Sequence, residues 1–187
     1  MKKLLLIAGD LATGKSTFAQ ILSERYQTPV FFKDQFKEIL GDTIGFSNRE
    51  ENLRLSVASA ALMRMVFTRF CKLDKDLIME SNFRLEELNR LHEIGAEYGY
   101  EILTILLRAD VQVLHKRFLH RLHNENRHAV HASGGFEEFP AFEAYVLGQR
   151  ATAYPGQVIE ICADTFAYQK DSDLLLRIDG FMEVNNE

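Results

Sequence analysis

The chain has 187 residues, of which 47% are hydrophobic and 26% are charged, and these values are typical of a globular protein with a core of its own. A formal net charge of -5 argues against broad, non-specific binding to nucleic acid, because neutralising phosphates requires a basic surface. The two cysteines, Cys71 and Cys162, indicate neither a disulfide framework nor a metal motif, which fits a reducing cytoplasm.

The apolar run LLLIA near the N-terminus is too short for a signal peptide and leads directly into Gly9-Asp10. The sequence has no apolar stretch of the length that a membrane-spanning helix requires. We therefore expect a single domain over residues 1–187 that is cytoplasmic and has no membrane partner.

Short apolar runs alternate with longer amphipathic segments, a pattern that predicts parallel strands joined by crossover helices. The expected strands cover residues 3–9, 29–33, 76–80, 101–108 and 157–162. The expected helices cover residues 15–26, 51–72, 85–99, 110–125 and 171–181, and Asp110 would cap the fourth of them. The predicted fold class is therefore α/β.

Two stretches show no clear period, namely residues 41–48 and residues 124–140. The second contains Gly134-Gly135 and ends at Pro140. Because long irregular insertions in compact domains are often lids over functional sites, we expect a lid over about residues 118–140.

The segment GDLATGKST, residues 9–17, matches the phosphate-loop pattern G-x-x-x-x-G-K-[ST] and lies between a predicted strand and a predicted helix, as that motif requires. The glycines let the backbone turn its N–H groups toward phosphate oxygens, and the helix dipole adds to that field. The alternative is a glycine-rich turn that merely connects a strand to a helix. The predicted nucleotide ligands from this loop are Gly9, Asp10, Ala12, Thr13, Gly14, Lys15, Ser16 and Thr17, with the Ser16 hydroxyl also on Mg²⁺.

Acidic residues follow three of the predicted strands, at the edge where open α/β sheets bind ligands. Glu80 closes an apolar strand and is a candidate for holding Mg²⁺, partly through water, whereas Asp34 suits orienting or deprotonating an acceptor hydroxyl. Their roles could be interchanged, and ordinary capping is the alternative for both. Asp110 is expected to be a helix cap.

The segment HKRFLHRLHNENRHAVH, residues 115–131, is a local basic cluster in a net acidic chain. Arg121 and Arg127 are candidates for a clamp on transferring phosphates, while Arg117 fits either the clamp or a solvated helix face. Its histidines could form a zinc site, although solvated or phosphate-adjacent side chains are the favoured interpretation. They are His115, His120, His123, His128 and His131.

Over residues 2 to about 180, the chain resembles the small P-loop kinases. The segments that carry this resemblance are the phosphate loop and then, in this order, FKDQFKE, LIMESNFR and LRADVQVLHKRFLHRL with NRH. The resembling group includes chloramphenicol phosphotransferase, gluconate kinase, zeta-toxin-like kinases and the kinase domain of polynucleotide kinases. The resemblance implies a three-layer P-loop NTPase fold with a parallel five-stranded sheet in the order 2-3-1-4-5 and a helical lid that carries arginines.

The resemblance also implies roles for single residues. Lys15, Asp34, Arg121 and Arg127 would be catalytic, Asp34, Glu80 and Asn82 would contact the acceptor, and Ser16 and Glu80 would hold Mg²⁺. Arg117 would contact the nucleotide, and Asp164 and Thr165 would lie near its base.

The leading functional hypothesis is transfer of the γ-phosphate of ATP, with Mg²⁺, to a hydroxyl of a small molecule. A nucleic-acid end kinase is an alternative, because Phe31, Phe32, Phe36 and Phe46 offer aromatic rings near Asp34. A regulatory or toxin-like nucleotide-binding protein with slow hydrolysis is another. The expected partners are a nucleotide and a small acceptor, and the apolar face of residues 53–70 would suit either a core or a homodimer.

Overall fold

The computed structural model describes residues 2–125, 127–131, 135–151 and 153–183. Five parallel strands form a sheet in the order β2-β3-β1-β4-β5, which confirms the implied topology. The strands are β1 (Lys2–Gly9), β2 (Val30–Phe32), β3 (Leu77–Glu80), β4 (Tyr100–Arg108) and β5 (Gln157–Cys162).

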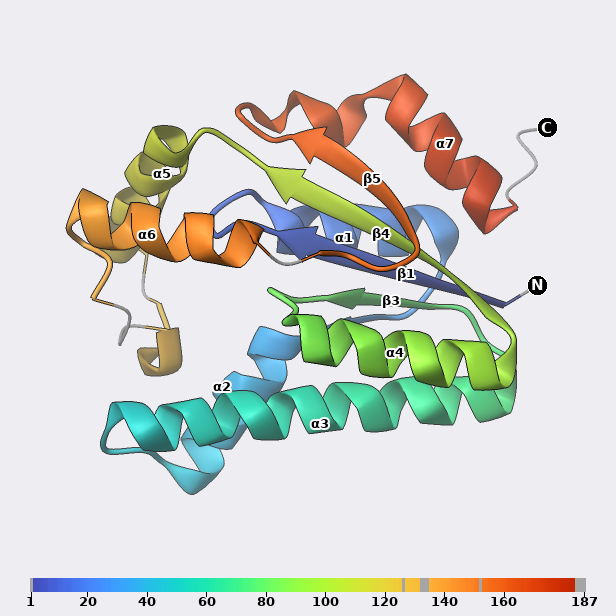
Figure 1. Ribbon diagram of the computed structural model, residues 1–187, viewed down its shortest axis with the longest axis horizontal. Coiled ribbons are helices and arrows are strands. Elements are labelled where there is room, and N and C mark those ends of the chain that lie inside the picture. The colour runs from blue at the N-terminus through green and yellow to red at the C-terminus, as the bar shows by residue number, and fades with distance from the viewer. Residues whose placement is uncertain (1, 126, 132–134, 152, 184–187) are drawn as a thin grey trace.

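The helices connect these strands in the alternating order that the sequence predicts (Figure 1). They are α1 (Lys15–Tyr26), α2 (Lys33–Ile44), α3 (Arg49–Leu73), α4 (Leu85–Tyr98), α5 (Val111–Asn124), α6 (Phe139–Arg150) and α7 (Ser172–Met182). Two short 3₁₀ helices, η1 (Ala129–His131) and η2 (Phe166–Lys170), precede α6 and α7. Asp110 caps α5, as expected, since its side chain accepts hydrogen bonds from Gln112 N and Val113 N.

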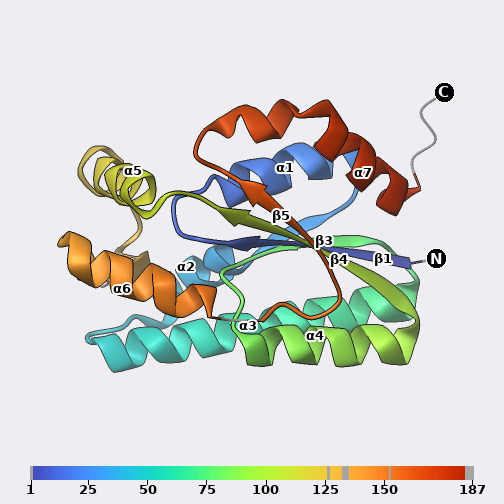
Figure 2. The ribbon, with the colours of Figure 1, turned by 45° about the horizontal axis from the view of Figure 1, so that its top comes forward.

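The sheet lies between two helical layers, with α1 and α7 on one face and α3 and α4 on the other (Figure 2). Alternate residues of β1 belong to two separate cores: Leu5 and Ile7 pack with Phe18, whereas Leu4 and Leu6 pack with Phe67. This burial on both faces explains why the central strand is apolar almost throughout.

The helices α2 and α6 differ from the sequence-based expectation. Residues 41–44 belong to α2, although they are expected to be irregular. Pro140 lies in the first turn of α6, where its missing N–H costs no helical hydrogen bond, so that it begins a helix instead of ending a loop. In α2, Asp34 lies in the first turn, where the helix dipole favours a negative charge.

The face of α3 is divided between core and solvent. Phe67 and Met63 are buried, whereas Leu53, Val57 and Met65 remain exposed. None of the helices in the described ranges combines the length and the hydrophobicity needed to cross a membrane.

The segment 127–131, in the middle of the predicted lid, is docked on α2 and α3. Val130 is 1% exposed, and its carbonyl oxygen accepts hydrogen bonds from Lys37 Nζ at 3.1 Å and from Asn52 Nδ2 at 3.0 Å. On either side, His128 Nε2 lies 2.9 Å from Asp42 Oδ1 and His131 Nε2 lies 2.8 Å from Glu38 Oε1. Residues 126 and 132–134 of the predicted lid lie outside the described residues.

Gly41 leaves the space on α2 into which Val130 fits, because a Cβ at this position would lie 2.5 Å from Val130 Cγ1. We expect Gly41→Ala to loosen the segment and to increase amide hydrogen exchange at residues 127–131. The matched control is Gly180→Ala in α7, where a Cβ would meet no atom within 4 Å. Unchanged exchange in Gly41→Ala, or an equal increase in both variants, would contradict this packing.

Candidate functional site

The phosphate loop begins at Gly9, where the end of β1 comes unusually close to the backbone of β4. Gly9 has a φ of 126°, and a Cβ there would lie 2.0 Å from the carbonyl oxygen of Leu107. Gly14 has a φ of 89° and caps α1, and its Cβ position lies 2.9 Å from the Phe166 ring. Both glycines are therefore required by a left-handed backbone as well as by the lack of space.

The ammonium group of Lys15 is buried under this loop. The residue is 7% exposed, and its Nζ donates a hydrogen bond of 2.6 Å to the carbonyl oxygen of Asp10. Burial lowers the pKa of Lys15, while the nearby charges of Glu80, Asp34 and Asp10 oppose that change. A buried cation at the N-terminus of a helix fits a phosphate ligand, which would supply the missing negative charge.

Ser16 and Glu80 provide adjacent oxygen atoms at the start of α1 and the end of β3. The Ser16 hydroxyl donates a hydrogen bond of 3.2 Å to Glu80 Oε2, and Glu80 is 4% exposed. Burial raises the pKa of Glu80 to about 7, against the opposing effect of Lys15. A hydroxyl and a carboxylate are ligands that suit Mg²⁺, so these residues fit the metal expected with a bound nucleotide.

The charge of Asp34 acts on both the phosphate loop and the predicted lid. It contributes to the pKa shifts of Lys15, Glu80 and Arg127. Arg121, whose Nε donates a hydrogen bond of 3.1 Å to Glu125, contributes to the same three pKa shifts. The fold thus brings these predicted residues within electrostatic range of one another.

Arg117, Asp164 and Thr165 form a second group, on the Phe166 side of Gly14. Arg117 donates hydrogen bonds to the carbonyl oxygens of Ala163 at 2.8 Å and Asp164 at 2.6 Å, and its guanidinium carbon lies 4.3 Å from the centre of the Phe166 ring. Thr165 caps η2. Arg117 therefore holds this loop in place and does not point into the group around Asp34.

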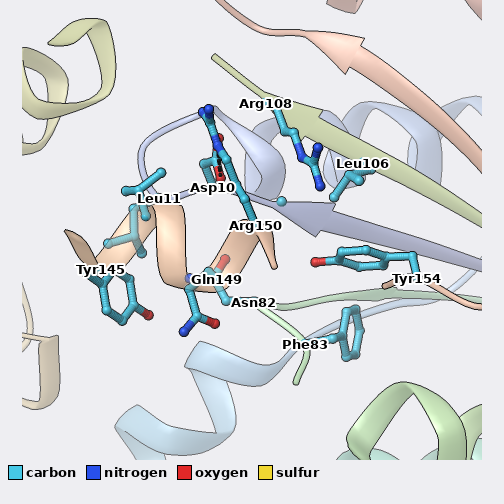
Figure 3. A pocket seen from close by; sticks show the side chains of 12 residues that line it. Asp10, Leu11, Asn82, Phe83, Leu106, Arg108, Tyr145, Gln149, Arg150 and Tyr154 are labelled. Carbon is cyan, nitrogen blue, oxygen red and sulfur yellow. Dashed lines mark hydrogen bonds and ion pairs between the residues drawn. The ribbon is translucent and has the colours of Figure 1, made fainter. Parts of the chain in front are cut away.

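A small open cleft with a cavity volume of about 20 Å³ lies between the start of the phosphate loop, the end of β3 and helix α6 (Figure 3). Asn82 and Phe83 line this cleft from the end of β3. The lining also includes Tyr145, Gln149 and Tyr154, which sequence analysis did not identify. No residue of the 36–65 segment contributes to it.

Arg150 is a further residue that sequence analysis missed. Its Nη2 donates a hydrogen bond of 2.7 Å to Asp10 Oδ2 and its Nε one of 3.2 Å to the same oxygen (Figure 3). Nη2 also donates to the carbonyl oxygen of Ala109. The Asp10 side chain is 4% exposed. This ion pair joins the phosphate loop to the last turn of α6, and no local pattern around Arg150 predicts it.

Three histidines of the basic segment have hydrogen-bond partners among the described residues. His128 and His131 pair with acids of α2, and His115 Nε2 lies 2.8 Å from the carbonyl oxygen of Glu137. In the described part of the chain, no group of three or more His, Cys, Asp or Glu side chains is arranged to hold a metal ion.

Removing Arg150 should destabilise the protein. In Arg150→Ala, the Asp10 carboxylate loses its buried partner, and we expect the free energy of unfolding to fall by about 3 kcal/mol in urea denaturation. The double variant Asp10→Asn, Arg150→Ala should recover part of this loss. Arg108→Ala is the matched control, because Arg108 pairs with Glu160, which is 55% exposed, and should cost less than about 1 kcal/mol. Equal losses in the two single variants would contradict the proposed importance of the Asp10 pair.

Glu80 should make the stability fall as the pH rises. Its raised pKa means that the folded state favours the protonated carboxyl. The free energy of unfolding therefore falls as the pH rises from 4.5, the usual pKa of a glutamate, to about 7, its pKa in the folded protein. The isosteric variant Glu80→Gln lacks this loss and should be more stable than wild type by about 3 kcal/mol at pH 8, with no advantage at pH 4. Urea denaturation at several pH values measures the difference in free energy of unfolding between Glu80→Gln and wild type. Glu24→Gln, at an exposed position, is the control. A difference that stays constant across this pH range would disprove the burial effect.

The comparisons with known proteins agree with this architecture. The family model described as Zeta toxin matches residues 1–139, and a search of curated proteins found no match. Among solved structures, a presumed kinase from Chloroflexus aurantiacus J-10-fl is similar, with a TM-score of 0.82 and 25% identity over 97% of this chain and 98% of that chain.

Two other kinases share the fold at lower identity. A gluconokinase from Sinorhizobium meliloti 1021 has a TM-score of 0.58 and 12% identity over 98% of both chains. The shikimate kinase from Bacteroides thetaiotaomicron has a TM-score of 0.58 and 15% identity over 97% of this chain and 98% of that chain. With a phosphate loop at the centre of such a fold, the chain belongs to the zeta toxin family of P-loop kinase-like proteins.

Proposed function

We propose that this protein transfers the γ-phosphoryl group of ATP, bound with Mg²⁺, to a hydroxyl group of a small molecule. The observation that carries the proposal is the position of Asp34, whose charge acts on Lys15 of the phosphate loop, on Glu80 and on Tyr145 of the cleft. A carboxylate located between a phosphate site and a cleft is suited to orient a hydroxyl nucleophile.

The donor side would be held by residues 9–17. Backbone N–H groups of this loop and the ammonium group of Lys15 would bind the phosphates, and Ser16 with Glu80 would hold the metal. When bound, ATP and Mg²⁺ supply the phosphoryl group and a divalent positive charge. Arg117 with the loop around Asp164 and Thr165 would lie on the side of the base.

The acceptor side would depend on Asp34 and on Asn82. Asp34 would accept the proton of the attacking hydroxyl, and Arg121 and Arg127 would stabilise negative charge on the transferring group. We propose residues 118–140 as the lid that excludes water, because water in an open site would compete with the acceptor.

The cleft beside α6 is small, with a cavity volume of about 20 Å³, so the acceptor side is assigned from Asp34 and not from this cleft. A nucleic-acid end kinase would need exposed aromatic rings, yet Phe31 and Phe36 stack on each other and pack against the core. A homodimer through α3 and a cytoplasmic location stay predictions.

Two variants separate binding from transfer. Lys15→Ala should abolish ATP turnover while the circular dichroism spectrum stays unchanged, because the loop loses its buried cation. Asp34→Asn should keep ATP binding but reduce transfer about 100-fold or more. ATP consumption is measured against a panel of antibiotics, sugars, nucleosides and oligonucleotides, with exposed Asp173→Asn as the control. Unchanged turnover in Lys15→Ala would refute the mechanism.

A further inference from the structure

Asn52, near the start of α3, is a buried polar residue whose side chain reaches outside its own helix. The residue is 3% exposed, and its Nδ2 donates a hydrogen bond of 3.0 Å to the carbonyl oxygen of Val130, 78 residues away in the sequence. Ser59, another buried polar residue of α3, instead donates its hydroxyl to the carbonyl oxygen of Ser56 in the same helix, at 2.9 Å. Because a buried amide is costly unless it is hydrogen-bonded, Asn52 is suited to hold the distant segment and not merely to fill the core.

The carbonyl oxygen of Val130 is held from two helices at once. Lys37 of α2 donates to it at 3.1 Å and Asn52 of α3 at 3.0 Å, and these two helices pack side by side (Figure 1). The Val130 side chain is 1% exposed and occupies the space that Gly41 leaves on α2. These contacts fix the backbone at residue 130, so the segment 127–131 is attached to the pair of helices that carries Asp34.

Arg127 lies at the start of this segment, three residues before Val130. Within the described ranges, its guanidinium group makes no hydrogen bond or ion pair. Burial lowers the pKa of Arg127, and the nearby charge of Arg121 acts in the same direction, whereas the charge of Asp34 opposes both. Since no contact of its own holds this cation, its position depends on the backbone that carries it.

From these contacts we infer that Asn52 is a positioning residue for phosphoryl transfer: it holds Val130 so that Arg127 stays within electrostatic range of Asp34. The inference rests on the proposed function, in which Arg127 stabilises negative charge on the transferring group. Without the amide of Asn52, the Val130 carbonyl keeps Lys37 as a donor, so the segment loosens without losing all of its contacts. Arg127 then spends part of its time away from the transferring group.

A transition-state analogue tests this positioning without knowledge of the acceptor. ADP with Mg²⁺ and aluminium fluoride imitates the transferring phosphoryl group, which ADP with Mg²⁺ alone lacks. Isothermal titration calorimetry measures the Kd of each ligand. We expect Arg127→Ala to raise the Kd of the analogue about 100-fold, because a charge contact is lost, and Asn52→Ala to raise it about fivefold, because one hydrogen bond of the segment is lost. The Kd of ADP should stay unchanged in both variants.

A double variant separates positioning from a general loss of structure. If Asn52 acts through Arg127, its removal has no further effect once Arg127 is gone, so Asn52→Ala, Arg127→Ala should bind the analogue as Arg127→Ala does. The matched control is Ser59→Ala, which loses a buried hydroxyl from the same helix and should match wild type for both ligands. Effects that multiply in the double variant, or a Kd of ADP that rises together with that of the analogue, overturn the inference.

Amide hydrogen exchange checks the attachment of the segment itself. Asn52→Ala should increase exchange at residues 127–131 and leave exchange in β1 and α1 as in wild type. Gly41→Ala loosens the same segment from α2, so it should also raise the Kd of the analogue, and it replaces Asn52→Ala if that variant does not fold.

The outcomes distinguish the two proposals. If Arg127→Ala weakens the analogue but a folded variant with a loosened segment does not, the inference is overturned and the phosphotransferase stands. If wild type binds the analogue no more tightly than ADP, the proposed function is overturned, and the inference with it.

Discussion

The burial of the Lys15 ammonium group beneath the phosphate loop is the constraint on which the rest of the site depends. A buried cation is costly unless negative charge lies close to it; the charges of Glu80 at the end of β3 and Asp34 at the start of α2 offset part of that cost, and a bound phosphate would offset more. Both acids follow strands adjacent in the sheet, since β3 separates β2 from β1. The order of the strands, and not the sequence spacing, therefore places the three groups together.

The Asp10 carboxylate extends this dependence to the cleft. The second residue of the phosphate loop is buried and negatively charged, so it requires a cation, and Arg150 provides it from the last turn of α6. The same helix carries Tyr145 and Gln149. The ion pair thus fixes the wall of the cleft relative to the phosphate loop.

The parts of the fold that local pattern determines could be predicted from the sequence. β1 and the phosphate loop follow from an apolar run with two glycines, and the strand order follows from the resemblance. Pro140 shows the limit, because a proline ends one segment and begins a helix with equal ease, so the pattern alone did not identify α6. Arg150, Gln149 and Tyr154 could not be predicted, because their positions in the site depend on tertiary contacts far apart in sequence.

The cations around the phosphate loop form two groups with different surroundings. Lys15, Arg121 and Arg127 gather around Asp34 and Glu80, where a phosphoryl group would carry negative charge, whereas the arginines of the cleft are neutralised by Asp10 and Glu160. A site arranged in this way would attract the phosphates of a nucleotide to the first group, whereas the arginines of the cleft hold α6 against the phosphate loop and β4 against β5.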